Sequence, residues 1–212
     1  MAGKLFGITG FKNSGKDSIG KILISNYEFC KDSFANPLKD ACSAIFGWPR
    51  YMLEGETEES REWREQVDEW WSNKLEFPEF SPRKALQYIG TDVFRQKFCS
   101  DIWLLSFENR FTKSNKNIVI TDCRFQNELN LIKFLNGTVI QVIRGPKPNW
   151  WELAAEVNIS NDFDKIDILE KELKIHPSEY SWVGFPADFY IENNGTKFDL
   201  ELQVIKIMEN SI

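Results

Sequence analysis

The segment from Gly10 to Asp17 reads GFKNSGKD, and it constrains the fold of this chain more than any other stretch. It follows an apolar run at residues 5–8 that predicts a short buried strand, and it precedes a run with helical spacing from Ile19 to Leu23. A strand, a glycine-bounded loop that ends in lysine, and a helix form the arrangement of a phosphate-binding P-loop. The sequence therefore predicts that phosphate groups bind between the first strand and the first helix.

Each residue type in this loop has a physical reason. Gly10 and Gly15 let the backbone bend so that consecutive N–H groups point at phosphate oxygens, and the helix N-terminus adds partial positive charge. Lys16 would reach the β- and γ-phosphates as a mobile point charge. An ordinary Gly/Ser-rich turn is the alternative interpretation.

The position after the lysine departs from the usual motif. Ser or Thr normally follows and binds magnesium, whereas this chain has Asp17 there and its hydroxyl one place later, at Ser18. A carboxylate can hold Mg²⁺ directly or through water, so we expect an altered magnesium site rather than none. The departure argues against a routine GTPase or motor ATPase.

The composition limits the class of partner. A chain of 212 residues with 42% hydrophobic content can bury one substantial core, and a net charge of −6 gives no electrostatic footprint for a nucleic-acid polymer. Four scattered cysteines without C-x-x-C spacing argue against a zinc site and a disulfide framework. Without a signal segment or a membrane-spanning apolar run, we expect a soluble, cytoplasmic protein with no membrane partner.

Alternating apolar and helical segments predict an α/β fold. Five segments are expected to be strands: Lys4–Thr9, Tyr27–Phe34, Ile118–Thr121, Thr138–Ile143 and Asp188–Ile191. Helical stretches between them predict a mostly parallel, doubly wound sheet flanked by helices. One such helix is expected over Phe125–Leu135, and the last starts near Thr196 with a capping box. The expected buried stripe of that last helix is Phe198, Leu202, Ile205 and Met208.

Two intervals do not fit a minimal core. The first, about Trp48–Ser114, is helical, acidic and tryptophan-rich, and the second, about Gly145–Gly184, opens with prolines. We therefore expect a single domain over 1–212 with its core at 1–47, 115–144 and 185–212. A P-loop core with two insertions suggests a small-molecule kinase, in which one insertion grips the acceptor and the other closes as a lid. Such a lid would keep water from a poised phosphoryl donor.

Three charged residues follow the third and fourth predicted strands. Asp122 at the carboxyl end of a buried strand would point into the ligand crevice and hold magnesium or accept a proton, unless it only caps the next helix. Arg124 would place a guanidinium near the phosphates, or pair with Glu128. Arg144 would contact phosphates from the root of the lid, or be a simple surface arginine.

Residues 81–98 form the second informative stretch. Ser81 and Pro82 are a conventional helix start, and apolar residues then fall on one face of a continuous helix. The opposite face is basic and polar in an otherwise acidic chain, which suits a phosphate plus the edge of a base. A solvated helix face is the alternative. The residues of the polar face are Arg83, Lys84, Gln87, Thr91 and Arg95.

The tryptophans and the single histidine carry weaker signals. Trp103, after the N-cap candidate Asp101, would pack in the core by default or stack on a base. The pairs at 70–71 and 150–151 could line the acceptor pocket or lid, and ordinary packing is the simpler interpretation. His176 cannot form a triad or a metal cluster with other histidines, and we expect it to be a polar lid residue.

Taken together, these motifs resemble the phage-type deoxynucleoside monophosphate kinases, P-loop enzymes that move a phosphoryl group from ATP to a deoxynucleoside monophosphate. The resemblance covers nearly the whole chain, least well between Trp48 and Phe80. The motifs that carry it are GFKNSGKDS at 10–18, ANPLKDA at 35–41, RKALQYIGTDVFR at 83–95, DIW at 101–103, ITDCRFQNE at 120–128, GTVIQVIR at 137–144, HPSE at 176–179 and ADFYIENNGT at 187–196. Asp17 is expected by this resemblance, which also implies the nucleoside monophosphate kinase version of the P-loop fold.

The resemblance and the residue chemistry together give an expected site. The expected ATP-binding residues are Gly10, Asn13, Ser14, Gly15, Lys16, Asp17, Ser18 and Arg144. The expected acceptor-binding residues are Arg83, Lys84, Gln87, Gly90, Arg95 and Trp103. The residues expected to act on the transferred group are Lys16, Asp17, Arg83, Asp122 and Arg124, and magnesium is expected near Asp17, Ser18 and Asp122.

The sequence thus predicts a kinase that uses ATP and Mg²⁺ to phosphorylate deoxynucleoside monophosphates in the cytoplasm, that of an infected host cell if a phage encodes it. Dimers are known in the family it resembles, so a homodimer is an open expectation. Two alternatives remain: another small-molecule kinase of the same fold, such as a dephospho-coenzyme A kinase, and a non-catalytic nucleotide-binding module.

Overall fold

The structure, a computed structural model, describes residues 3–210. It separates into two compact units. Unit 1 contains the chain up to Ser33 and again from Arg110 onward, and unit 2 is Phe34–Asn109. The helix-rich part therefore starts earlier than the predicted insertion at 48–114, because the helix after residue 35 belongs with unit 2.

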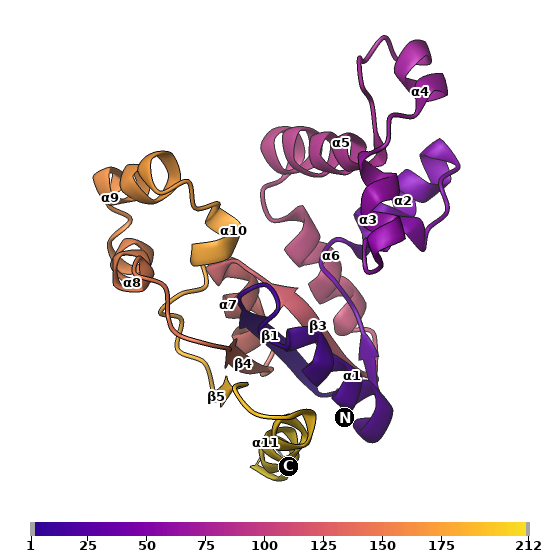
Figure 1. Ribbon diagram of the computed structural model, residues 1–212. Helices are drawn as coiled ribbons and strands as arrows, with labels where there is room; N and C mark the ends of the chain where they lie inside the picture. Colours follow the sequence, from indigo (N-terminus) through magenta and orange to yellow (C-terminus); the bar gives the residue numbers. More distant parts are fainter. Residues whose placement is uncertain (1–2, 211–212) are drawn as a thin grey trace. The chain divides into compact units, whose positions relative to one another are not determined.

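Unit 1 is built on a five-stranded sheet (Figure 1). Its strands are β1 (Leu5–Gly10), β2 (Phe29–Lys31), β3 (Asn117–Cys123), β4 (Thr138–Ile143) and β5 (Phe189–Glu192). The order is β2-β3-β1-β4-β5, and all four pairings are parallel. The predicted α/β fold with five parallel strands is confirmed. The second strand is shorter than predicted, because helix α1 runs on to Tyr27 and Glu28 caps it at a φ of 57°.

Helices cover both faces of this sheet, which explains the nearly continuous apolar sequence of its central strands. Helices α1 (Lys16–Tyr27) and α11 (Lys197–Asn210) share one buried cluster with β1 and β4. Helix α7 (Gln126–Phe134) packs against β1 and β4 through Ile132, which would lie 2.9 Å from a Cβ added to Gly7. This layering places the carboxyl ends of β1 and β3 and the start of α1 at one edge of unit 1.

The last helix begins as predicted but buries a different stripe. Thr196 and Asp199 exchange hydrogen bonds in the expected capping box. The buried residues are Leu200, Val204, Ile207 and Met208. Of the predicted stripe only Met208 is among them; Phe198 is 66% exposed and Leu202 40%. That prediction was wrong because both sets fit a helical period, and only contact with α1 and the sheet selects between them.

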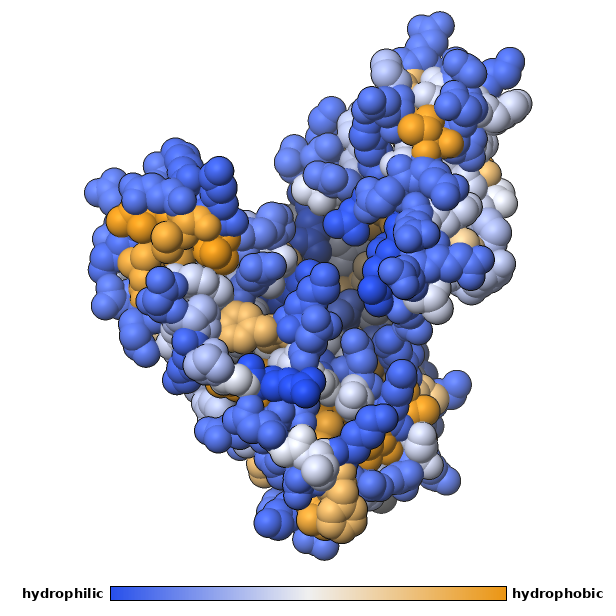
Figure 2. Space-filling view, in the orientation of Figure 1, coloured by the Kyte–Doolittle hydropathy of each residue, from blue (hydrophilic) through white to orange (hydrophobic). Residues whose placement is uncertain are grey.

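Between β4 and β5, unit 1 carries a run of short helices. They are α8 (Trp151–Ser160), α9 (Phe163–Asp167), the π-helical turn η3 (Ile168–Glu172) and α10 (Pro177–Tyr180). Figure 2 shows apolar side chains gathered over α8 and α9, where Ile159 and Phe163 are 82% and 83% exposed. His176 lies at the start of α10, where its Nδ1 accepts a hydrogen bond from the backbone N–H of Ser178.

Unit 2 is helical and has an aromatic core. Its elements are α2 (Asn36–Phe46), the 3-10 turn η1 (Met52–Glu54), α3 (Glu58–Glu65), α4 (Glu69–Lys74), α5 (Pro82–Gln87), the π-helix η2 (Tyr88–Phe98) and most of α6 (Ile102–Phe111), whose last two residues belong to unit 1. Phe46 stacks on Trp48 at 4.5 Å and meets Trp71 edge-on at 5.1 Å. The indole N–H of Trp71 donates to the carbonyl of Phe46, so this tryptophan serves packing, the simpler of its two interpretations.

The predicted continuous α-helix over 81–98 is only partly present. It starts as expected, with Ser81 accepting a hydrogen bond from the N–H of Lys84, and changes to π-helical geometry at Tyr88. A glycine at position 90 weakens the α-helix there, and its carbonyl accepts a hydrogen bond from Trp103. A π-helical turn holds more residues than an α-helical turn. The basic and polar face, which was predicted at 100° per residue, therefore does not continue in the same direction after residue 87. None of the helices in the described residues is both long and apolar enough to cross a membrane.

Candidate active site

The loop between β1 and α1 has the conformation that its glycines predicted. Gly10, Asn13 and Gly15 have positive φ values of 146°, 64° and 109°. A Cβ on Gly10 would lie 2.2 Å from the carbonyl oxygen of Val142, so only glycine fits beside β4. Helix α1 starts at Lys16 without a side-chain cap, which leaves its first N–H groups free to bind an anion. The loop is therefore shaped as a phosphate site.

Lys16 is held inside this loop. Its Nζ donates to the carbonyls of Gly10 and Phe11 at 2.8 and 2.5 Å. The pKa of Lys16 is lowered to about 8, mainly by burial; the positive charge of Arg124 acts in the same direction, while the carboxylates of Asp17 and Asp122 oppose it. A bound phosphate would replace the two carbonyls with a full negative charge and favour the protonated lysine.

Carboxylates and hydroxyls surround the end of the loop. Thr121 Oγ1 donates to Asp17 Oδ1 at 2.9 Å, and Ser33 Oγ donates to Asp122 Oδ2 at 3.2 Å. The hydroxyl of Ser14 is buried and has no hydrogen-bond partner in the described part of the chain. These oxygens are of the type that Mg²⁺ prefers. Within residues 3–210, no group of three or more acidic, histidine or cysteine side chains is arranged around a common metal position.

The carboxyl end of β2 adds a carboxylate that the sequence analysis missed. Arg110 Nη2 donates to both carboxylate oxygens of Asp32 at 3.2 Å and to the carbonyl of Ser33 at 3.3 Å. Since Ser33 also bonds Asp122, the ends of β2 and β3 form one polar network. Asp32 follows a strand, and the same rule that identified Asp122 as a site candidate could have identified Asp32.

A cavity of about 490 Å³ opens beside the loop. This volume is within the range of small-molecule sites. Its lining residues are Asn13, Gly15, Lys16, Asp17, Ser18, Arg144, Asn193, Gly195, Thr196, Lys197 and Leu200. The predicted ATP-binding residue Arg144 therefore lies on the same cavity as Lys16, although they are far apart in the sequence. The turn at residues 193–197, to which the sequence analysis gave no site role, forms the other wall.

Two adjacent asparagines connect this turn to neighbouring segments. Asn193 Nδ2 donates to the carbonyl of Ser14 at 2.8 Å, and a Cβ on Gly15 would lie 2.3 Å from the same nitrogen. Asn194 Oδ1 accepts a hydrogen bond of 2.8 Å from the backbone N–H of Gly145, where the chain leaves β4. The P-loop and the start of the 145–184 segment are thus both fixed to the turn after β5.

A second connection between the P-loop and the 145–184 segment is apolar. The ring of Phe11 contacts Trp150, Trp151 and Trp182 with centroid distances of 5.6, 5.8 and 4.9 Å. Trp151 and Trp182 are buried, so both serve packing in unit 1. The first residue after Gly10 is therefore surrounded by side chains of the predicted lid.

Unit 2 contains the predicted acceptor-binding residues. Arg83 and Gln87 are exposed on α5, and Lys84 forms an ion pair of 2.9 Å with Glu79. Arg83 lies 3.9 Å from a carboxylate oxygen of Glu65, and both side chains are more than half exposed. Farther along, Arg95 is half-buried on η2.

Trp103 and Gly90 support each other in the core of unit 2. The indole Nε1 donates to the Gly90 carbonyl at 3.0 Å, and Trp103 is 7% exposed. A Cβ on Gly90 would lie 2.5 Å from Leu38, which also explains why glycine is needed there. These contacts favour the core interpretation of Trp103, and a role of either residue in substrate binding stays a prediction.

Comparisons with known proteins show that the sequence of this chain is similar to one family. The family model described as deoxynucleotide monophosphate kinase matches residues 50–150. A protein of Acanthamoeba polyphaga mimivirus, provisionally named a deoxynucleotide monophosphate kinase, is 30% identical over 221 residues, which cover 98% of this chain and 97% of the relative. The chain belongs to the deoxynucleotide monophosphate kinase family. The resemblance predicted from the motifs is confirmed.

Two phage relatives of the kinase family are also similar to this chain. The deoxynucleoside-5'-monophosphate kinase of Escherichia phage T5 is 27% identical over 247 residues, covering 92% of this chain and 90% of the relative. The deoxynucleotide monophosphate kinase of Enterobacteria phage T4 is 25% identical over 202 residues, covering 69% of this chain and 84% of the relative. The mimivirus and T5 comparisons extend over nearly all of both proteins, so the likeness is not confined to the P-loop.

In this family member, Glu128 bonds to the backbone at Arg124 and not, as the alternative interpretation of Arg124 would have it, to its guanidinium. The Glu128 carboxylate accepts hydrogen bonds from the backbone N–H groups of Arg124 and Phe125, at 2.8 and 3.2 Å. Glu128 thus caps the start of α7, an ordinary use of glutamate at a helix N-terminus. The charge of Arg124 acts on Lys16, as its effect on the lysine pKa shows.

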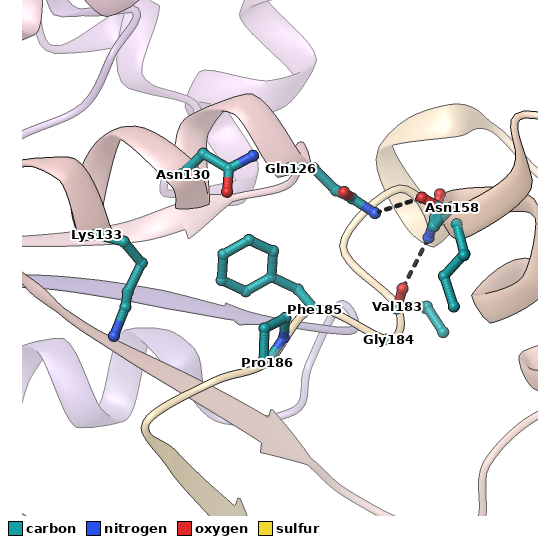
Figure 3. Close-up of a pocket in the computed structure, with 9 residues that line it drawn as sticks. Gln126, Asn130, Lys133, Asn158, Val183, Gly184, Phe185 and Pro186 are labelled. Carbon is teal, nitrogen blue, oxygen red and sulfur yellow. Dashed lines mark hydrogen bonds between the residues drawn. The ribbon is translucent and has the colours of Figure 1, made fainter.

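Unit 1 of this kinase-family chain has a second cavity, of about 340 Å³, which Figure 3 shows between α7 and the segment 183–186. Asn158 donates from its side-chain amide to the carbonyls of Tyr180 and Val183, both at 2.8 Å. Phe185 lines the cavity and is itself buried. None of the predicted site residues lines it, and the hydrogen bonds of Asn158 tie α8 to the segment that returns to the sheet.

Proposed function

We propose that this protein transfers the γ-phosphoryl group of ATP to a deoxynucleoside monophosphate and releases ADP and the deoxynucleoside diphosphate. The observation that carries the proposal is the P-loop cavity: a glycine-shaped anion loop, Lys16 and Arg144 surround one space at the end of β1. Membership of the kinase family supports the choice of acceptor.

In this proposal, the donor nucleotide binds in unit 1. The backbone N–H groups of residues 10–18 and the ammonium of Lys16 hold the β- and γ-phosphates. Arg144 and Arg124 add positive charge around the transferring group, where charge neutralisation and positioning account for most of the catalysis. The turn at 193–197 completes the wall of the donor cavity.

Magnesium would be held by Asp17, Ser18 and Asp122. The donor set fits, because Mg²⁺ is commonly bound by one or two carboxylates together with substrate phosphates and waters. When bound, the ion would neutralise phosphate charge. Thr121 orients the Asp17 carboxylate, and Ser33 does the same for Asp122.

Unit 2 would bind the acceptor through Arg83, Lys84, Gln87 and Arg95. Guanidinium and ammonium groups suit the monophosphate, and a glutamine amide suits the edge of a base. The segment 145–184 would act as the lid, since Phe11 and Gly145 connect it to the donor loop and to the turn after β5. We also propose that the enzyme works in the cytoplasm and binds neither a membrane nor a nucleic-acid polymer. We further propose that it forms a homodimer, and sedimentation would test this oligomeric state.

An acceptor panel tests the proposed reaction. The purified protein is incubated with ATP and Mg²⁺ and with each of the four deoxynucleoside monophosphates, their ribonucleotide counterparts or dephospho-coenzyme A. We expect ADP release that depends on a deoxynucleoside monophosphate, with the diphosphate product detected by chromatography. ADP release that occurs only with dephospho-coenzyme A would show that the protein is a dephospho-coenzyme A kinase instead. ATP binding without acceptor-dependent release would assign a nucleotide-binding module.

A further inference from the structure

Arg64 on α3 is a half-buried cation that the sequence analysis did not consider. Its Nε is buried and has no hydrogen-bond partner within residues 3–210. An unpaired buried guanidinium nitrogen is costly, because the hydrogen bonds that water would supply are lost. A native protein keeps such a group where another requirement outweighs its cost to stability.

The guanidinium of Arg64 is fixed in place by Gly55. A Cβ at position 55 would lie 2.0 Å from Nη2 and 2.1 Å from Cζ of Arg64, so the planar group rests directly on the glycine backbone. Gly55 has a φ of 66°, in the left-handed region that also favours glycine. Any side chain at this position would displace the guanidinium, so the loop after η1 serves as a platform for it.

The pKa of Arg64 is lowered overall, first by burial and then by the positive charge of Arg83. Arg61 acts in the same direction, whereas the carboxylates of Glu65 and Glu54 oppose the shift. The nearby Glu54 is already paired with Lys39 at 2.6 Å and with Arg50. Helices α3 and α5 pack against each other, which brings Arg64 and Arg83 into this relationship. Glu65 lies near both guanidiniums but contacts Arg83 only at 3.9 Å, so an anion bound between the two arginines would stabilise them.

We infer that Arg64 and Arg83 together bind the monophosphate group of the acceptor, with Arg64 as its half-buried, preoriented ligand. The inference rests on the proposed function, and it adds to it a residue that fixes where on unit 2 the phosphate binds. Arginine suits this role because its planar fork can donate two parallel hydrogen bonds to phosphate oxygens. Arg83, which is exposed and only loosely paired with Glu65 at 3.9 Å, would supply the second donor group.

Calorimetric binding separates this inference from the proposed reaction. Each of dAMP, dCMP, dGMP and dTMP is titrated into the wild-type protein, and the tightest ligand is compared with its unphosphorylated deoxynucleoside. We expect Arg64→Met to weaken monophosphate binding about 10- to 100-fold, the range for a lost hydrogen bond to a charged group, and to leave nucleoside binding unchanged. Lys74→Gln, which removes one exposed charge from the same unit, should change neither.

Two further measurements exclude a merely structural arginine. Removing a half-buried cation whose Nε is unpaired should leave the urea midpoint of Arg64→Met equal to that of the wild type or raise it, whereas a structural arginine would lower it. Gly55→Ala should weaken monophosphate binding in the wild type but add nothing in the Arg64→Met background, because it acts by displacing Arg64.

The outcomes are distinct. If the wild type binds none of the four monophosphates, the proposed function fails and the inference fails with it. If the wild type binds one of them and Arg64→Met binds it equally well, or if the variant loses nucleoside and nucleotide affinity alike, only the role of Arg64 is overturned. Retained affinity in Arg64→Lys would show that a point charge is enough and would contradict bidentate binding.

Discussion

The side-chain amide of Asn193 donates a hydrogen bond of 2.8 Å to the carbonyl of Ser14, and so joins the turn after β5 to the P-loop. The two residues are separated by 179 positions in the sequence. A Cβ on the adjacent Gly15 would lie 2.3 Å from the same amide nitrogen, so the glycine makes room for the contact. The position of the P-loop therefore depends on a distant asparagine.

We expect Asn193→Ala to raise the KM for ATP about 3- to 10-fold, since one neutral hydrogen bond contributes about 0.5–1.5 kcal/mol and the loop would lose its anchor. The KM for the acceptor should stay within twofold, and steady-state kinetics with each substrate varied would show the difference. Asn130→Ala is the matched control, because Asn130 is an exposed asparagine of unit 1 that lines the other cavity. Equal effects of the two substitutions would refute a specific role for Asn193.

Lys16→Ala should abolish phosphoryl transfer, with a fall in kcat of at least about 100-fold, because the charge closest to the transferring phosphate is lost. The fold should remain intact, since the hydrogen bonds of the lysine ammonium go to two loop carbonyls and the group is partly desolvated. Far-ultraviolet circular dichroism and urea unfolding would check this. Near-normal turnover in a correctly folded variant would remove the P-loop from the mechanism.

Local sequence rules predicted the parts of the site that local chemistry determines. The glycines of the P-loop, the start of α1 and the position of Asp122 at the carboxyl end of β3 all follow from spacing within a few residues. Arg144 was expected near the phosphates because it follows the fourth predicted strand at the root of the lid, and the pairing of β4 with β1 accounts for its place beside the loop. In each case the deciding residues are adjacent in the sequence or in hydrogen-bonded strands.

The parts that could not be predicted depend on tertiary contacts. No local signal connects Asn193 with Ser14, and the buried face of α11 is selected by α1 rather than by its own pattern. The change to π-helical geometry after Gln87 coincides with a carbonyl at Gly90 that Trp103 binds from another helix. Arg64 looks like a solvated arginine in an acidic helix, and only its contact with Gly55 shows that it is fixed.

The four cysteines should react with a thiol reagent in an order set by burial. Cys30 is exposed, whereas Cys42 and Cys123 are buried, and burial raises the pKa of Cys42 to about 11. Because the thiolate is the reactive form, Cys42 should stay unreactive as the pH rises from 7 to 9, which is still below its pKa. Mass spectrometry after timed labelling would identify the modified residues. Rapid labelling of Cys42 in the folded protein would contradict the packing of α2.

Phe11 should couple the P-loop to the 145–184 segment, because its ring contacts three tryptophans of that segment. We expect Phe11→Ala to raise the KM for ATP and to shift the tryptophan emission to longer wavelength, since each lost aromatic contact contributes about 0.5–1.5 kcal/mol and water would reach the indoles. Phe11→Leu, which keeps an apolar side chain, should retain more of both properties. If the segment closes over the donor, ATP should shift the tryptophan emission to shorter wavelength in the wild type and in Phe11→Leu. An unchanged KM together with an unchanged emission spectrum in Phe11→Ala would show that the loop and the segment act independently.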